Sequence, residues 1–189
     1  MLRAIYKRLQ ERRARKIGRL LGKFVRKGDS VLDLGMGTGL VAERLQLGND
    51  VNILGLDIHD CNITDIPLVI NDPKNLPFRS DQFDVVLLIS VLHHASNFVY
   101  LLTEAKRICK RSIIILEDVY STETERIFIM FTDVISNCMG SLNMPFNFHR
   151  EREWLVIFKK LGLELVHKQY QGIPWLNLFQ RVLFVLEPQ

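Results

Sequence analysis

The chain has 189 residues, 48% of them hydrophobic, so it is large enough to bury the core of one domain and leaves no room for a second. Its three cysteines, Cys61, Cys109 and Cys138, lack metal-binding or redox spacing, which favours a reduced, cytoplasmic protein. The N-terminus is basic without an apolar segment, and the most apolar run, 127–139, is interrupted by polar residues and is too short to cross a bilayer. We therefore expect neither a secretory leader nor a membrane span.

The first 27 residues carry most of the positive charge. They contain 11 Lys or Arg and one Glu, whereas the remainder is net acidic and the whole chain is +4. Apolar residues recur at helical spacing between the bases, which predicts one or two amphipathic helices. Such a segment either packs through its apolar face and leaves its cations in water, or makes weak contact with RNA or an anionic membrane. We interpret residues 1–27 as a separate basic segment and 28–189 as a single domain.

A predicted strand followed by three alternate glycines occupies residues 31–39, which read VLDLGMGTG. The apolar residues around Asp33 are typical of a buried parallel strand, and Gly35, Gly37 and Gly39 allow bare backbone to pass beneath a nucleoside group. The sixth-position glycine of the dinucleotide fingerprint and the Gly-Lys-Ser/Thr end of a phosphate-binding loop are both absent. Because a carboxylate at Asp33 would repel a phosphate, the pattern favours a ligand with an ammonium or sulfonium group. The alternative is an ordinary glycine-rich turn.

The segment after the glycines is predicted to be helical at 40–47, and a second apolar strand at 52–56 ends at Asp57. Asp57 lies near the spacing at which a carboxylate at the end of a strand receives ribose hydroxyls. Asp60, by contrast, is interpreted as a helix cap or a solvated loop residue. The connection that follows is short, so we expect only a turn or an abbreviated helix at 61–66.

The second half of the chain is predicted to alternate helices and strands. In chain order we expect a helix at 98–109, a buried strand at 112–116 that ends in Glu117 and Asp118, a helix in the first half of 121–149, a loop at 140–148, a helix at 151–161 stopped by Gly162, and a final strand pair at 163–170 and 179–186.

Three stretches make the chain resemble the class I S-adenosylmethionine-dependent methyltransferases, most closely the small-molecule subgroup called type 11. They are VLDLGMGTG (31–39), GLDIHD (55–60) and NDPKNLPFRSDQFDVVLLISVLHH (71–94). The resemblance is close over residues 31–118 and general thereafter. It implies an α/β, Rossmann-like, doubly wound fold with a seven-stranded, mostly parallel sheet whose last strand is antiparallel. It also implies S-adenosyl-L-methionine as the cofactor, bound over the carboxyl ends of the first strands.

The resemblance assigns cofactor-binding roles to the positions that match the family's motifs. Gly35, Gly37 and Gly39 would line the methionine and ribose portions, with Asp33 near the amino group. Asp57 would take the ribose hydroxyls, and Ile58 would pack on the adenine ring. Asp72 would face the adenine amino group, Pro73, Asn75 and Leu76 would contact the ring, and Ser90 would lie under the methionine part.

The resemblance also implies that the insertion at 121–149 covers the substrate. This segment is rich in Met and Phe and includes Phe146 and Phe148, so it would suit a greasy or aromatic acceptor. The alternative is that these residues close the hydrophobic core.

Methyl transfer from a sulfonium is an in-line displacement that mainly requires alignment of donor and acceptor and exclusion of water. If the acceptor is a hydroxyl or an acidic carbon, His93, His94 and His149 are the candidates to take its proton. We expect one of the adjacent pair, His93 and His94, to face away from any common target; alternatively, the pair caps the strand and packs the next helix. Glu117 or Asp118 could position a polar acceptor.

No metal site is predicted from the sequence. His59, Asp60 and Cys61 are clustered, but no second group of ligands at zinc spacing accompanies them.

Three functions are compatible with these patterns. The first is an enzyme that methylates a small, apolar or aromatic molecule. The second is an RNA-directed methyltransferase recruited by the basic N-terminal segment, and the third is a non-catalytic binding protein with a cofactor fold. The intact glycines and acids argue against the third, whereas salt-sensitive RNA binding through residues 1–27 would favour the second.

Overall fold

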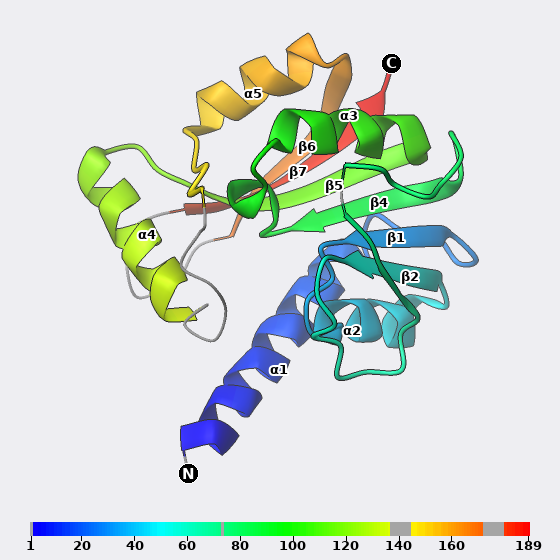
Figure 1. The fold of residues 1–189 in the computed structure, drawn as a ribbon, viewed down its shortest axis with the longest axis horizontal. Helices are drawn as coiled ribbons and strands as arrows, with labels where there is room; N and C mark the ends of the chain where they lie inside the picture. Colours follow the sequence, from blue (N-terminus) through cyan, green and yellow to red (C-terminus); the bar gives the residue numbers. More distant parts are fainter. Residues whose placement is uncertain (1, 73, 137–144, 172–179) are drawn as a thin grey trace. The chain divides into compact units, whose positions relative to one another are not determined.

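The computed structural model of the protein describes residues 2–72, 74–136, 145–171 and 180–189 (Figure 1). Seven strands form a sheet in the order β3-β2-β1-β4-β5-β7-β6. Strand β1 pairs in parallel with β2 and β4, and β2 pairs in parallel with β3, whereas β7 runs antiparallel to both β5 and β6. The predicted fold class, a mostly parallel sheet with an antiparallel last strand, is confirmed.

The chain divides into two compact units, and the first comprises Met1–Leu87 and Ile108–Arg111. The elements in or beginning in this unit are α1 (Leu2–Leu21), β1 (Ser30–Leu34), α2 (Leu40–Asn49), β2 (Asn52–Asp57), β3 (Leu68–Ile70) and β4 (Phe83–Ile89).

The basic N-terminal segment forms one helix, α1, which packs beside α2 (Figure 1). Ala14, Ile17 and Leu21 are buried on the packed side. A Cβ on Gly18 would lie 2.9 Å from the Cβ of Arg44, so glycine permits the close approach of the two helices. The cations of the described part of α1 lie on its exposed side. Its C-terminal half is therefore an amphipathic helix held by apolar packing.

The connection between β2 and β3 contains bends and no helix, in agreement with the expectation from its length. Asn62 organises it: its side-chain amide donates to the Ile66 carbonyl (2.8 Å), and its Oδ1 accepts the Thr64 N–H (2.9 Å) and hydroxyl (2.8 Å). The Ile63 N–H donates to the Thr38 carbonyl (3.1 Å) and so ties this connection to the glycine loop.

The second unit comprises Leu88–Arg107 and Ser112–Gln189. Its elements are the 3₁₀ turn η1 (Leu92–His94), α3 (Phe98–Ile108), β5 (Cys109–Val119), α4 (Glu123–Ser136), α5 (Glu151–Lys160), β6 (Leu163–Gln171) and β7 (Gln180–Pro188). The last residue of α3 and the first residues of β5, Ile108–Arg111, belong to the first unit.

Strand β5 is longer than predicted, because its pairing with β7 continues to Val119. Asp118 lies opposite Arg181 in that register, and the guanidinium donates two hydrogen bonds to its carboxylate (2.7 and 2.8 Å). The expectation that the strand stops at residue 116 was therefore wrong: the cross-strand ion pair lets a polar residue continue the strand.

The core of the second unit contains a chain of aromatic rings from α5 to β7. The ring centroids of Trp154 and Phe158 lie 5.8 Å apart, and those of Phe158 and Phe184 lie 5.3 Å apart. All three side chains are almost fully buried. Each contributes about 1.5–3 kcal/mol of hydrophobic stabilisation, so α5 is firmly anchored. None of the helices in the described ranges combines the length and the apolar character that crossing a bilayer requires.

Candidate functional site

The glycine loop between β1 and α2 adopts a backbone that only glycine tolerates well. Gly35, Gly37 and Gly39 have φ values of 81°, 58° and 76°. A Cβ built on Gly37 would meet no atom within 4 Å, so this peptide has an open face. The N–H groups of Gly35 and Met36 both donate to the Leu56 carbonyl (2.7 and 3.2 Å), which anchors the start of the loop to β2.

Asp57, the last residue of β2, is bonded directly to this loop. Its Oδ2 accepts the Gly37 N–H (2.8 Å), and its Oδ1 accepts the N–H groups of Ile58 (2.7 Å) and His59 (3.2 Å). The prediction that Asp57 ends the second strand is confirmed. The carboxylate is only half-buried, so it both shapes the loop and remains accessible.

Asp33 lies inside the unit, at the end of β1, with 2% of its surface exposed. Burial, and secondarily the negative charge of Asp57, raises the pKa of Asp33 to about 7. A cation placed beside it would favour its ionised form.

Asn62 and Thr64 are functional candidates that the sequence did not identify. A Cβ on Gly39 would lie 2.5 Å from Thr64 Oγ1 and 2.6 Å from Asn62 Oδ1, so these side chains press against the end of the loop. The signal that could have found them is the sequence Asn-Ile-Thr, because Asn and Thr side chains commonly hydrogen-bond to nearby backbone in turns.

The predicted adenine-contacting residues have different environments. Ile58 is 54% exposed although it is apolar, whereas Leu76 is buried. Asp72 and Asn75 are exposed and belong to one turn, in which Asp72 Oδ1 accepts the Lys74 N–H (2.9 Å) and the Asp72 carbonyl accepts the Asn75 N–H (3.2 Å). Pro73 lies outside the described residues.

A second group of candidates lies in the second unit, around His93. Its Nδ1 is 2.5 Å from Glu117 Oε2, and both side chains are buried. The other oxygen of Glu117, Oε1, accepts the N–H groups of Val91 (2.9 Å) and Leu92 (2.8 Å). Glu117 is thus neither a loop residue nor exposed: it holds the η1 turn and the histidine in place.

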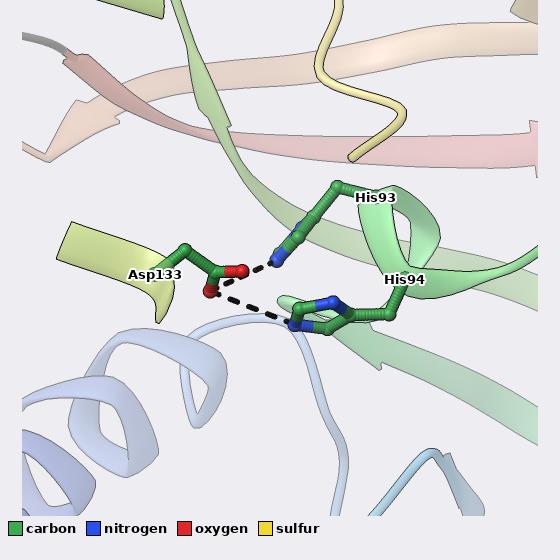
Figure 2. A group of neighbouring side chains, drawn as sticks. All are labelled: His93, His94 and Asp133. Carbon is green, nitrogen blue, oxygen red and sulfur yellow. Dashed lines mark ion pairs between the residues drawn. The ribbon is translucent and has the colours of Figure 1, made fainter. Parts of the chain in front are cut away.

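Both imidazoles of the pair reach the same carboxylate. Nε2 of His93 and Nε2 of His94 each lie 3.6 Å from Oδ1 of Asp133 on α4, and Figure 2 shows both rings directed toward it. The expectation that one of the pair faces away from any common target was wrong. The two residues are adjacent in the 3₁₀ turn η1, and Asp133 on α4 lies within reach of both rings.

The two histidines have opposite protonation tendencies. Burial alone would lower the pKa of His93, but the carboxylates of Glu117 and Asp133 outweigh it and raise the pKa to about 10. Burial and the neighbouring charge of His93 lower the pKa of His94. At neutral pH, His93 is therefore the charged member of the pair.

His149 has a different environment. Its Nδ1 lies 2.9 Å from the Asn147 carbonyl oxygen, and its ring centroid lies 4.9 Å from that of Phe98 and 4.8 Å from that of Trp154. The residue of this segment that stacks on His93 is Phe148, at 4.5 Å between centroids.

Ser90, at the end of β4, has a positive φ of 58°. Its N–H donates to the Leu116 carbonyl (2.8 Å). A left-handed conformation in a residue other than glycine is sparsely populated and occurs preferentially at functional sites.

The predicted cover at 121–149 is partly core and partly exposed apolar surface. Tyr120, Ile129 and Phe148 form a buried cluster, with Met130 and Phe146 packed against it. On α4, the helix that carries Ile129, the side chains of Ile127 and Phe131 are 67% and 62% exposed. Met139 and Met144 lie outside the described residues.

Residues 32–116 match the family model described as "Methyltransferase domain". A 27-O-demethylrifamycin SV methyltransferase of Amycolatopsis mediterranei is 30% identical over 116 residues, covering 54% of this chain and 43% of that protein. A sterol 24-C-methyltransferase of Aspergillus fumigatus is 25% identical over 180 residues, covering 80% of this chain and 45% of that protein. The chain thus spans less than half the length of these curated relatives.

A similar solved structure is magnesium protoporphyrin IX methyltransferase from Synechocystis with bound SAH. Its TM-score is 0.67 at 14% identity, and the match covers 94% of this chain and 83% of that one. At this level of identity the similarity concerns the fold.

Proposed function

We propose that this chain transfers a methyl group from S-adenosylmethionine to a small, apolar or aromatic acceptor. The match of residues 32–116 to a methyltransferase family model supports both the reaction and the cofactor. The observation that carries the proposal is the glycine loop bonded to Asp57: its open backbone face and its accessible carboxylate are the two features that a nucleoside with a charged tail requires.

The roles proposed for the individual residues are those that the family resemblance implies, and their environments are compatible with them. In the first unit, the loop glycines would lie against the methionine and ribose portions, Asp57 would accept the ribose hydroxyls, and Asp33 would balance the positive amino group. The exposed Ile58 would cover one face of the adenine, and Asp72, Pro73, Asn75 and Leu76 would surround the ring. In the second unit, the family resemblance would place Ser90 under the methionine part, and its φ of 58° is compatible with a functional position.

An apolar acceptor is supported by the surface of α4. Ile127 and Phe131 are large hydrophobic side chains that water surrounds in the ligand-free chain. An acceptor with a hydrophobic body would remove them from water, which stabilises by about 25 cal/mol for each Å² buried. The names of the curated relatives fit this class of acceptor, since they refer to a rifamycin and a sterol.

Of the three candidate bases, His94 is the one that the geometry favours. Both nitrogens of His93 face carboxylates, and its side chain is 2% exposed, whereas 28% of the His94 side chain is exposed. His149 is held among aromatic rings. Methyl transfer to an acceptor that has already lost its proton needs no base, and then His94 would only orient the acceptor.

Calorimetry with the purified chain tests the proposal. S-adenosylmethionine and S-adenosylhomocysteine should bind with micromolar dissociation constants, which correspond to roughly 8 kcal/mol. NAD is the control ligand, because it shares the adenosine but not the sulfonium tail. If neither sulfur ligand binds, the proposed function is wrong; if NAD alone binds, a dinucleotide enzyme replaces it.

The second candidate function, an RNA-directed methyltransferase, is favoured by one observation, the exposed cations on α1. Helix α1 also has a buried face that packs on α2, so the fold accounts for this helix without RNA binding.

A further inference from the structure

Three side chains of the second unit direct ligand atoms at one point. His93, His94 and Asp133 each offer one nitrogen or oxygen, and these atoms all lie within 4.8 Å of one another (Figure 2). The two Nε2 atoms each lie 3.6 Å from Asp133 Oδ1, which is within ion-pair range and longer than a normal hydrogen bond. It is close to the separation of about 3.4 Å between neighbouring ligand atoms around a tetrahedral ion with bonds of about 2.1 Å.

The ring nitrogen of His93 that faces away from Asp133, Nδ1, contacts a carboxylate, as in many metal-bound imidazoles. Glu117 Oε2 lies 2.5 Å from Nδ1, which leaves Nε2 directed toward Asp133. Metal-ligating histidines almost always donate their other N–H to a carboxylate or carbonyl, which fixes the ring and strengthens the ligand. Glu117 is itself held by two backbone N–H groups, so the orientation of His93 is determined before any ion binds.

The group formed by His93, His94 and Asp133 has a buried side and a side accessible to solvent. His93 and Glu117 are buried, and the ring of Phe148 stacks on His93. The side chains of His94 and Asp133 are 28% and 13% exposed. An ion held by these three ligands would therefore keep a position for water or an acceptor atom, as three-ligand zinc sites do.

We propose that His93, His94 and Asp133 bind a divalent transition-metal ion, with Zn²⁺ as the ion that suits the ligands best, and that Glu117 is the positioning residue. Two imidazoles and one carboxylate suit zinc and its neighbours in the first transition row, whereas Mg²⁺ and Ca²⁺ prefer oxygen ligands. With the ion bound, His94 is a ligand and no longer a base. The proposal involves no residue of the first unit and does not depend on the proposed methyl transfer.

A zinc titration tests this proposal. The chain, freed of metal and carrying Cys61→Ser to remove a thiol that is exposed in the described part of the chain, is titrated with Zn²⁺ in competition with a chromophoric chelator. We expect one equivalent to bind with a micromolar or lower dissociation constant. His94→Gln and Asp133→Asn, which preserve side-chain size, should weaken binding at least a hundredfold, and Glu117→Gln should weaken it about 10- to 100-fold. His167→Gln, an exposed position on β6, is the matched control and should bind like the parent chain.

The spectrum of bound Co²⁺ provides a second readout, because imidazole ligation changes its visible absorption, and circular dichroism shows whether each variant is folded. The proposal is overturned if the parent chain takes up no stoichiometric Zn²⁺ at 10-fold excess over about 1 μM protein, a result that needs no variant. It is also overturned if folded His94→Gln binds as tightly as the His167→Gln control. Binding of S-adenosylmethionine is measured separately, so failure of the metal site and failure of the proposed function are distinguishable.

Discussion

At the scale of single residues, Asp57 has two tasks. It accepts the Gly37 N–H and, in our proposal, the ribose hydroxyls. Asp60 is the matched control, since it is exposed and accepts the Asn62 N–H within its own turn (3.3 Å).

We expect Asp57→Ala to weaken binding of S-adenosylhomocysteine by about 2–4 kcal/mol and Asp60→Ala to change it by less than about 0.5 kcal/mol, because only the first loses charge-assisted bonds to the ligand. Isothermal titration calorimetry measures both. Equal losses in two folded variants would contradict the role assigned to Asp57.

The raised pKa of Asp33 predicts that the stability of the folded chain depends on pH. Its folded pKa of about 7 lies above its ordinary value of 3.8, so between these values the folded chain holds a proton that the unfolded chain has released. The stabilisation is complete below pH 3.8 and is lost as pH rises through 7.

Replacing this carboxyl by an amide removes the effect. Relative to wild type, Asp33→Asn should therefore gain in free energy of unfolding from pH 5 to pH 8, by up to roughly 3 kcal/mol. Urea denaturation of the ligand-free chain at several pH values provides the measurement. A difference between the two proteins that stays constant over this range would show that Asp33 is ionised throughout.

At the scale of elements, α4 and β5 should differ in local stability. Residues 113–116 of β5 are fully buried between paired strands, whereas α4 exposes Ile127 and Phe131 and buries Ile129. A segment that admits a substrate is drawn from the less stable parts of a fold.

Hydrogen exchange of the ligand-free chain should therefore show the amides of 123–133 exchanging well before those of 113–116. This test requires no known acceptor. If both segments are equally protected, α4 is part of the hydrophobic core. The proposal of an apolar acceptor beneath the segment 121–149 then loses its basis.

Helix α1 allows the RNA alternative to be tested without deleting a packed helix. Arg12 and Arg15 lie on its exposed side, and Lys159 and Lys160 are exposed at the end of α5. The double variants Arg12→Glu/Arg15→Glu and Lys159→Glu/Lys160→Glu change the net charge equally.

If the cations of α1 are only solvated and do not bind RNA, both double variants should show the same small loss of RNA affinity relative to wild type. Their free energies of unfolding should stay within about 0.5 kcal/mol of wild type. Filter binding at two salt concentrations gives the comparison. A loss of salt-sensitive binding confined to the α1 variant would support the RNA-directed enzyme instead.

At the scale of the whole molecule, cofactor binding should appear as thermal stabilisation. A ligand present at 100 times its dissociation constant adds about 2.7 kcal/mol to the free energy of unfolding. For a chain of this length, we expect saturating S-adenosylhomocysteine to raise Tm by roughly 5–10 °C, and NAD to leave it unchanged. Differential scanning fluorimetry with both ligands checks this, and equal shifts would indicate recognition of adenosine alone.

Much of the fold could be predicted from local sequence. The glycine spacing and the apolar strand ending at Asp57 are features of contiguous residues, and they predicted β1, the loop, α2 and β2 where the structure has them. The short connection before β3 was likewise predicted from its length. Such features depend on local backbone conformation and on periodicity, which a single segment specifies without reference to the rest of the chain.

Other features depended on which distant segments meet. Strand β5 continues past residue 116 because Arg181 faces Asp118 from β7, and His93 is held by Glu117 and faced by Asp133. These partners lie 24 to 63 positions apart in the chain. Contacts of this kind are decided by strand register and helix packing, and no local periodicity encodes them. The sequence by itself thus determined the architecture and the glycine loop, whereas only the tertiary structure showed which side chains surround the histidine pair.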